Sequence, residues 1–108
     1  MDKYEQYIKE RSGLSLYEDN DGFFTYQIQD NNMFIQDLFV AKQARNSGVG
    51  RRYSETIDKI ANENDCRTIT CNICVRANNY MDSFNFIKKM GYQVFKNEYT
   101  LVYLIKEL

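Results

Sequence analysis

Histidine and proline are absent from this chain of 108 residues, and cysteine occurs only three times. A chain without histidine lacks the commonest general base, the usual partner of a serine or cysteine nucleophile and the commonest zinc ligand. Hydrolases of the Ser-His and Cys-His kinds are therefore excluded. Cys71 and Cys74 lie three apart in a predicted strand, where they point to opposite faces, and no second pair completes a zinc site. We predict that these two and Cys66 are small core or half-buried residues, and that the chain holds no metal.

Net charge is almost absent as well, and so are long apolar runs. The net charge of −1 argues against nucleic-acid binding, because proteins of that kind carry a basic face. No apolar run approaches the roughly 20 residues of a membrane span, and the first residues show no basic-then-apolar export signal. The 44% of hydrophobic residues is ordinary for a globular protein. We expect one domain over residues 1–108, cytoplasmic, with neither membrane nor nucleic acid among its partners.

Strand-forming runs and helical spacings alternate along the chain. Asn20-Asp21-Gly22 is typical of a hairpin turn, and apolar residues from Val49 onward recur at the spacing of one helix face. This alternation predicts an α/β fold with a mixed sheet. The expected elements are a short N-terminal helix ended by Gly13, strands over 14–18, 23–29 and 33–40, a helix over 50–64, a strand over 67–75, a helix over 79–90, and strands over 92–95 and 99–105 joined by a turn at 96–98.

Two glycines, Gly48 and Gly50, stand between a strand ending at Val40 and the following helix. A helix start leaves backbone N–H groups unpaired at the positive end of the helix dipole, and glycine lets a ligand approach the main chain. The segment therefore predicts a phosphate-binding loop. A dinucleotide fold is a poorer interpretation, because it needs a third glycine where this chain has Tyr53. Positive charge is added by nearby basic residues, namely Lys42, Arg45, Arg51 and Arg52.

The pattern Arg45-x-x-Gly48-x-Gly50, placed after Leu38-Phe39-Val40, resembles the pyrophosphate loop of the GNAT N-acetyltransferase superfamily. Later landmarks of that family follow in order, because Asn78-Asn79 opens a helix that closes with Phe86-Ile-Lys-Lys-Met-Gly91-Tyr92. The resemblance implies a GNAT-like, mostly antiparallel central sheet flanked by helices, with a shortened N-terminal region. It also implies acetyl-CoA as the co-substrate.

The resemblance assigns roles to particular residues. Backbone groups of residues 38–40 would pair with pantetheine and polarise the thioester carbonyl, while the amides of residues 46–50 would hold the pyrophosphate. Asn79 would start the next helix and hydrogen-bond the cofactor, although its distance from Gly91 is one residue longer than the family's usual pattern. The implied cofactor-binding set is Leu38, Phe39, Val40, Arg45, Asn46, Ser47, Gly48, Val49, Gly50, Arg51 and Asn79.

In this family an amine attacks the thioester directly, so the resemblance implies an N-acetyltransferase that works in a ternary complex. The family's proton-donating tyrosine lies four residues before Gly91, and that position is Ile87 here. Tyr80 and Tyr92 lie nearby in sequence and could substitute, or could merely pack in the core. We predict Tyr92 as the substitute acid.

A base that takes the proton of the amine is expected on the strand over 33–40. This strand offers Gln36 and Asp37, of which only Asp37 ionises, and strand alternation places Asp37 on one face with Ile35 and Phe39. We predict Asp37 as the base. A solvated or salt-bridged Asp37 is the alternative, since water chains also serve as the base in this family.

The acceptor is expected to be an amine, either a small molecule or a protein. Relatives place two helices before the sheet and this chain has room for about one, so the acceptor site should be open. An open site suits a protein N-terminus or lysine, or a site completed by a second subunit in a homodimer. A small polyamine would need acidic residues such as Asp19, Asp21 or Asp30 to hold its charge, although these also suit ordinary turns.

Two other functions remain open from the sequence. One is a catalytically impaired CoA-binding module with a regulatory or interaction role, motivated by Ile87 and by the reduced acceptor region. The other is an α/β adaptor with no cofactor, whose nine tyrosines and seven phenylalanines build a core and a partner interface. Only the adaptor predicts no response to CoA.

Overall fold

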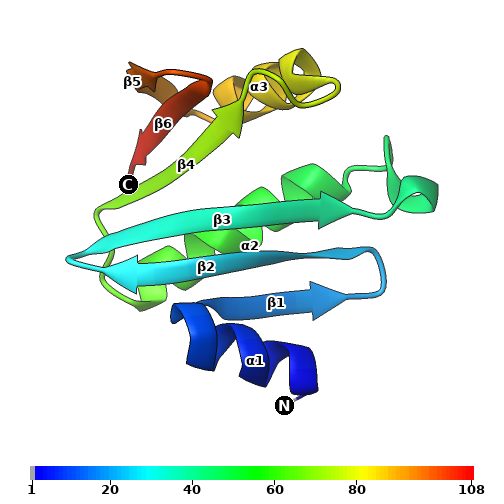
Figure 1. Ribbon diagram of the computed structural model, residues 1–108, viewed down its shortest axis with the longest axis vertical. Coiled ribbons are helices and arrows are strands. Elements are labelled where there is room, and N and C mark those ends of the chain that lie inside the picture. Colours follow the sequence, from blue (N-terminus) through cyan, green and yellow to red (C-terminus); the bar gives the residue numbers. More distant parts are fainter. Residues whose placement is uncertain (1) are drawn as a thin grey trace.

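The computed structural model describes residues 2–108 and arranges them around a six-stranded sheet (Figure 1). The strand order is β1-β2-β3-β4-β6-β5, and all neighbours are antiparallel except β3 and β4, which are parallel. The predicted mixed sheet is therefore confirmed. The elements are α1 (Lys3–Ser12), β1 (Ser15–Asp19), β2 (Gly22–Gln29), β3 (Asn32–Val40), the 3₁₀ turn η1 (Lys42–Ala44), α2 (Val49–Glu63), β4 (Thr68–Cys74), α3 (Tyr80–Lys89), β5 (Gln93–Glu98) and β6 (Leu101–Glu107).

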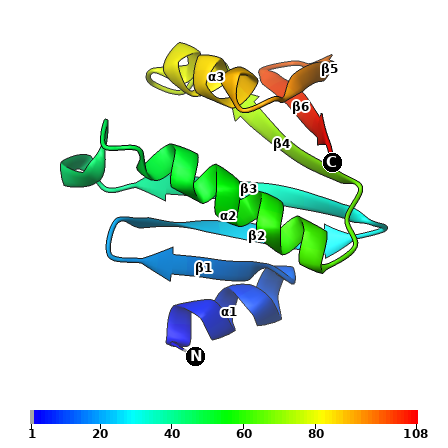
Figure 2. The same cartoon turned by 180° about the vertical axis from the view of Figure 1, so that it is seen from behind.

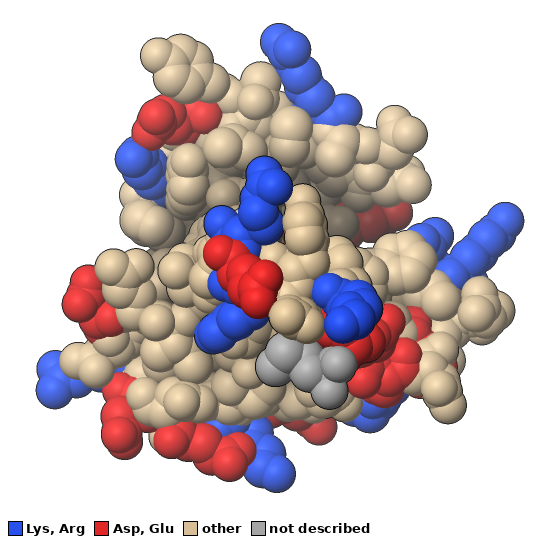
Figure 3. Space-filling view, turned by 60° about the horizontal axis from the view of Figure 1, so that its bottom comes forward, with Lys and Arg blue, Asp and Glu red and all other residues tan. Residues whose placement is uncertain are grey.

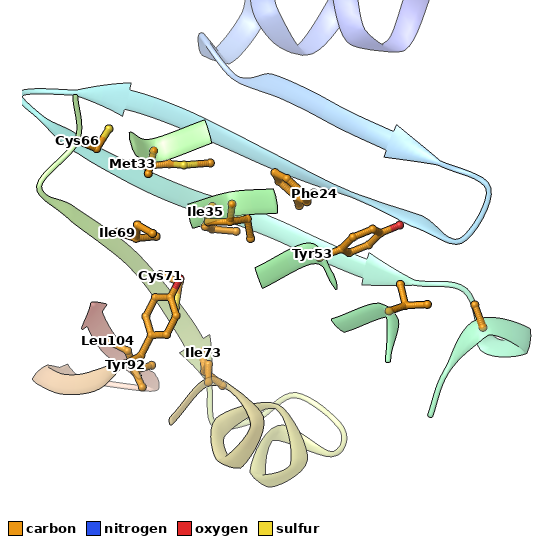
Figure 4. Packing of buried hydrophobic residues seen from close by; sticks show 14 residues of the cluster. Phe24, Met33, Ile35, Tyr53, Cys66, Ile69, Cys71, Ile73, Tyr92 and Leu104 are labelled. Carbon is orange, nitrogen blue, oxygen red and sulfur yellow. The ribbon is translucent and has the colours of Figure 1, made fainter. Parts of the chain in front are cut away.

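Helix α2 covers the face of the sheet that Figure 2 shows, where it crosses in front of β2 and β3. Its apolar stripe buries Tyr53, Ile57 and Ala61 against the sheet, as the three-to-four spacing predicts. Helix α3 packs beside it, because a Cβ atom added at Gly50 would lie 2.9 Å from the Phe86 ring. The main core therefore lies between α2 and the strands (Figure 4).

The short N-terminal helix α1 has a defined cap at each end. The Asp2 carboxylate accepts a hydrogen bond from the Glu5 amide at 2.7 Å. Gly13 ends the helix in the left-handed conformation, with φ 69°, as predicted. None of the helices within residues 2–108 is long and apolar enough to cross a membrane.

The hairpin of β1 and β2 is fastened to the end of β3. Gly22 approaches β3 so closely that a Cβ atom there would lie 1.9 Å from the Phe39 carbonyl oxygen. The Ala41 amide then donates a hydrogen bond to the Asp21 carbonyl at 2.7 Å. The turn of this hairpin therefore supports the chain just before η1 and the glycine loop.

Strands β3 and β4 separate partway along their length. They pair through four residue pairs, from Asn32 opposite Thr68 to Ile35 opposite Cys71. Beyond that point β3 pairs with β2 alone and β4 with β6 alone, and the two strands diverge (Figure 1). A wedge-shaped split results, closed at Ile35 and Cys71 and open toward the ends of both strands.

A β-bulge corrects the predicted orientation of Asp37. Tyr26 pairs with Ile35, but its neighbour Thr25 pairs with Asp37, so Gln36 is an extra residue in β3. The extra residue inverts the alternation, and Asp37 therefore lies on the opposite face of the sheet from Ile35, contrary to the prediction. The bulge could not be seen in the sequence, because nothing in the strand pattern marks Gln36.

The turn between the last two strands also differs from the prediction. The polar run over 96–98 belongs to β5, and the turn falls at Tyr99 and Thr100, where Tyr99 adopts a positive φ of 55°. β5 is one of the two edge strands of the sheet, and all six of its residues are exposed. Polar residues suit such an edge strand, and so their presence does not indicate a turn.

The cysteines lie where the sequence predicts. Cys71 is buried and Cys74 is partly exposed on alternate faces of β4, and Cys66 is buried just before the strand. All three are free thiols. Among residues 2–108, no group of three or more histidine, cysteine, aspartate or glutamate side chains is placed to hold a metal ion.

Candidate functional site

The glycine loop forms the rim of a cavity of about 420 Å³, the outer cavity. Its walls come from the end of β3, from residues 44–51, which lead into the first turn of α2, and from one face of α3. Three basic residues line it, namely Arg45, Arg51 and Lys89, against one acidic residue, Asp82. The outer cavity is therefore a positively charged recess at the start of a helix.

Gly48 sets the geometry of the loop. It has φ 84°, a conformation that glycine adopts without strain, and a Cβ atom added there would meet no atom within 4 Å. The first hydrogen bond at this end of α2 runs from the Arg52 amide to the Gly48 carbonyl, at 3.1 Å. The preceding amides, of Val49, Gly50 and Arg51, therefore have no acceptor within the helix and are available to an anion.

Two side chains hold the loop against the end of β3. Arg45 donates a hydrogen bond from Nε to the Val40 carbonyl at 3.0 Å, and the Ser47 hydroxyl donates to the Ala44 carbonyl at 2.5 Å. The terminal nitrogens of Arg45 stay available, because only Nε makes this bond. The loop is thus ordered by its own residues.

Arg52 turns away from the outer cavity, although its position in the sequence groups it with Arg51. Its guanidinium makes ion pairs of 2.7 Å with both Asp19 and Asp21 in the turn of the first hairpin. Asp19 also accepts a hydrogen bond of 2.5 Å from the Tyr53 hydroxyl. These four residues form a cluster, the hairpin latch, that ties α2 to the β1–β2 turn.

The hydrogen bonds of the hairpin latch shift the pKa values of its ionisable groups. The Tyr53 hydroxyl and the Arg52 guanidinium hold the pKa of Asp19 well below its usual range. Burial, together with the same carboxylate, raises the pKa of Tyr53. At neutral pH the latch is therefore an ionised carboxylate held by a neutral phenol and a cation.

A second cavity, the inner cavity, occupies the split between β3 and β4. Its volume is about 410 Å³, and it lies beneath the contact of α2 with α3. Both predicted proton-transfer residues line it, because Asp37 is on the β3 wall and Tyr92 follows α3. The remaining lining residues are Ile35, Gln36, Leu38, Gly50, Ser54, Ile57, Cys71, Asn72, Ile73, Ala77, Ser83, Phe86, Ile87 and Met90.

Tyr92 closes one side of the inner cavity and points toward Cys71 on β4 (Figure 4). Only 6% of Tyr92 is exposed, and burial, with smaller effects of Cys71 and Asp58, raises the pKa of its hydroxyl. Burial also raises the pKa of the Cys71 thiol to about 11. Both groups therefore stay protonated and uncharged at neutral pH.

The cavities collect most of the predicted site residues, but not all of them. Phe39 lies on the other face of the sheet, where its ring contacts Phe23 at 5.7 Å between centroids. Ser47 and Asn79 line neither cavity, and Asn79 starts α3 without a side-chain cap bond. The structure therefore brings together Asp37, Leu38, Val40, Arg45, Asn46, Gly48, Val49, Gly50, Arg51 and Tyr92.

Apart from Ile87, the cavity-lining residues of α3 were not predicted from the sequence. The cavity-lining residues of this helix and its end are Asp82, Ser83, Phe86, Lys89 and Met90. They recur at three-to-four spacing, so one helix face carries them all. That spacing was available as a signal, although the amphipathic pattern alone does not distinguish a cavity wall from a core contact.

The acidic residues considered as anchors for a polyamine are engaged or distant. Asp19 and Asp21 are held by Arg52 in the hairpin latch, and Asp30 lies in the β2–β3 turn at the opposite end of β3 from the glycine loop. Acidic and basic side chains are interspersed on the face of the molecule seen in Figure 3. None of these three carboxylates is therefore placed to hold a polycation at the inner cavity.

The sequence matches the model of the Acetyltransferase (GNAT) family over residues 1–92. In structure, the chain is similar to PaiA N-acetyltransferase from Thermoplasma acidophilum in complex with coenzyme A. That match has a TM-score of 0.76 at 16% identity and covers 94% of this chain and 66% of the other, so this chain spans just under two thirds of that protein. No curated protein matches the sequence with significance.

Two further solved structures show the same likeness. An acetyltransferase from Bacillus subtilis in complex with CoA matches with a TM-score of 0.73 at 14% identity, over 99% of this chain and 86% of the other. The IAA acetyltransferase from Bacillus cereus matches with a TM-score of 0.70 at 15% identity, over 82% of this chain and 70% of the other. At these identities the likeness shows the fold, and it confirms the fold class that the sequence predicts.

Proposed function

This chain belongs to the GNAT acetyltransferase family, and from that membership we propose that it transfers an acetyl group from acetyl-CoA to a primary amine by direct attack in a ternary complex. The observation that carries the proposal is the position of the glycine loop at the mouth of the split between β3 and β4. A charged recess thereby leads into a largely apolar cavity. We propose residues 1–108 as a single acyl-CoA-binding domain.

The residues of the outer cavity suit the phosphates of CoA. The amides of Val49, Gly50 and Arg51 have no acceptor within α2, and the space before Gly48 is open. Side chains of Arg45 and Arg51 supply the positive charge that the pyrophosphate needs. Lys89, from α3, adds a third cation that the sequence did not suggest.

Strand β3 suits the arm that joins the phosphates to the thioester. Past the four pairs with β4, the edge of β3 that faces the split has no strand partner, so its N–H and C=O groups can bond to the amides of pantetheine. Leu38 and Val40 line the outer cavity, and Leu38 lines the inner one as well. Acetyl-CoA would supply an activated thioester, and these backbone groups would orient it.

Proton transfer is assigned to Asp37 and Tyr92, two of the ionisable groups that line the inner cavity. Asp37 is exposed on the side of the sheet away from the helices, so it would accept a proton from an amine arriving from that side. Tyr92 lies within the split and stays protonated, so it would supply a proton to the leaving sulfur through water in the part of the inner cavity that an acetyl group leaves open. The two groups would then act from opposite sides of the acyl carbon.

A catalytically impaired CoA-binding module is the second candidate, and Ile87 favours it. The side chain of Ile87 lines the inner cavity at the position of the family's tyrosine, so the usual hydroxyl is replaced by an alkyl group. Such a protein would bind CoA as described and would transfer no acetyl group. The rest of the site is the same in both candidates.

Thermal unfolding of the purified protein tests the cofactor first. A ligand at about a hundred times its dissociation constant stabilises the folded state by about 2.7 kcal/mol. We expect acetyl-CoA and CoA to raise the Tm by several degrees and ATP to raise it little. A screen of amine acceptors, in which the release of CoA from acetyl-CoA is measured, then separates the two candidate functions. No shift at saturating acetyl-CoA would contradict both and leave the adaptor.

A further inference from the structure

The outer and inner cavities adjoin each other. They share lining residues at their junction, where α2, α3 and β3 meet. A ligand long enough to occupy both would therefore run from the glycine loop into the split. The shared residues are Leu38, Gly50, Ser83, Phe86 and Met90.

The chemistry of the wall changes along this passage. The outer cavity has three basic residues, whereas the inner cavity has no lysine or arginine, and Asp37 is its one charged lining residue. At the closed end of the split the lining groups are Ile35, Ile57, Cys71 and Tyr92. Cys71 and Tyr92 are uncharged there, because burial raises the pKa of each. The closed end therefore offers an apolar environment to whatever reaches it.

The inner cavity is deeper than an acetyl group requires. The thioester carbonyl is assigned to the backbone near Leu38, and Ile35 lies two to three residue rises farther in, roughly 7–10 Å along the strand. On the helix wall, the distance from Gly50 to Ile57 is seven residues, or about 10 Å. An acetyl group ends one carbon beyond the carbonyl. Its methyl group cannot fill the space between Leu38 and Ile35.

We propose that the closed end of the inner cavity binds the chain of an acyl-CoA longer than acetyl-CoA, so that this protein accepts short to medium acyl groups. This inference rests on the proposed function, because CoA must first occupy the outer cavity. An acyl chain is the occupant that the passage favours, since it is apolar, unbranched and attached to the ligand whose phosphates the outer cavity suits. A volume of about 410 Å³ is within the usual range for ligand pockets.

Dissociation constants for CoA, acetyl-CoA, butanoyl-CoA and hexanoyl-CoA, measured by calorimetry on the wild-type protein, test the inference. Each methylene that becomes buried should tighten binding by about fourfold. We expect hexanoyl-CoA to bind at least tenfold more tightly than acetyl-CoA. If CoA and acetyl-CoA bind but hexanoyl-CoA binds equally or more weakly, the inference fails and the proposed function stands. If CoA itself does not bind, both fail.

A pair of cysteine substitutions tests where in the fold the acyl chain of the ligand binds. Cys71→Phe places a ring at the closed end of the inner cavity, whereas Cys74→Phe places the same ring on the same strand but outside the cavity lining. We expect the ratio of the hexanoyl-CoA to the acetyl-CoA affinity to fall close to one in Cys71→Phe and to stay at the wild-type value in Cys74→Phe. An unchanged ratio in a folded Cys71→Phe variant would contradict the inference, because the acyl chain would then bind elsewhere, for example at the acceptor site. The wild-type series decides the inference even if Cys71→Phe does not fold.

Discussion

At the scale of single residues, the two glycines of the loop have different physical roles. Gly48 has a positive φ and open space before it, which suits an approaching ligand. Gly50 instead gives room to the Phe86 ring, which would lie 2.9 Å from a Cβ atom, and so it sets how closely α2 and α3 pack. The sequence pattern treats the two glycines alike, but only at Gly48 is the absence of a side chain explained by space for a phosphate.

Substitutions at Gly48 separate backbone strain from loss of ligand space. Alanine and valine both suffer the strain of a positive φ, about 1–2 kcal/mol, but only valine carries branches into the open space. We expect both variants to lose stability in urea unfolding, Gly48→Val at least as much as Gly48→Ala because a β-branched residue tolerates a positive φ poorly, and Gly48→Val to bind CoA at least tenfold more weakly than Gly48→Ala by calorimetry. Equal CoA affinities would show that the space before Gly48 is not the phosphate site.

Ile87 offers a test of the missing proton donor. Ile87→Tyr would place a hydroxyl in the inner cavity, where the family carries one, while Ile87→Phe adds the ring alone. A positioned general acid contributes on the order of a hundredfold or more. We therefore expect Ile87→Tyr to raise kcat at least tenfold over Ile87→Phe, followed as CoA release with an amine found in the screen. Similar rates in the two variants would assign the donor to another group or to water.

At the scale of elements, the loop is held from two sides. Arg45 and Ser47 fix it to the end of β3 and to η1, and the hairpin latch fixes the first turns of α2 to the β1–β2 turn. These contacts come from segments far apart in the sequence, since Asp19 and Arg52 are separated by 33 residues. The start of α2 is therefore positioned before any ligand binds.

Removing the latch carboxylate should lower stability in a pH-dependent way. The pKa of Asp19 is lowered by folding, so its contribution is complete above the unfolded value, about 4, and is lost as the pH falls through the folded value. We expect Asp19→Asn to lower the free energy of unfolding at pH 7 by about 2 kcal/mol, and the difference from wild type to shrink below pH 4. Chemical unfolding across this range measures it.

Asp21→Asn is the matched control for the latch. It shares the Arg52 pair but makes no bond to Tyr53, and the Asp21 side chain is 42% exposed, so its loss should be smaller. If the two variants lose equal stability at pH 7, the Tyr53 bond adds nothing and the latch is only a surface ion pair.

At the scale of the whole molecule, local patterns predicted the elements well and long-range geometry poorly. The strand-forming runs of β1 to β3, the apolar stripe of α2 and the helix end at Gly13 all depend on neighbouring residues, and the structure follows them. The bulge at Gln36 depends on how β2 and β3 register. The late turn at Tyr99 depends on β5 being an edge, and neither feature has a marker in the sequence.

The site shows the same division. The loop around Gly48 was predictable because its chemistry is contained in one short segment. The pairing of Arg52 with Asp19 was not, because it requires knowing that the hairpin turn reaches α2. Lys89 joins the outer cavity for the same kind of reason, since the angle of α3 decides which of its faces meets the loop.

Thiol labelling of the native protein tests the burial pattern across the sheet. Cys74 is partly exposed, while Cys66 and Cys71 are buried and have raised pKa values, which slows reaction of a thiol. At pH 8 we expect one fast labelling event, at Cys74, and two that occur only at the rate of unfolding. Mass spectrometry of the labelled peptides identifies the sites. Fast labelling at Cys71 would mean that the inner cavity opens readily to solvent.

The four-pair contact between β3 and β4 has a consequence for how this sheet meets other chains. An unpaired strand edge normally invites association with a strand of another molecule, and proteins protect such edges. Past Ile35 and Cys71, this sheet has two such edges in its interior, facing each other beneath α2 and α3. Because the two edges face each other and α2 and α3 cover them, a strand of a neighbouring protein has little room to pair with either edge. A thin molecule with amide groups, such as the pantetheine arm of the proposed CoA ligand, would fit there better than a protein strand, so the same geometry would disfavour association and favour a small ligand.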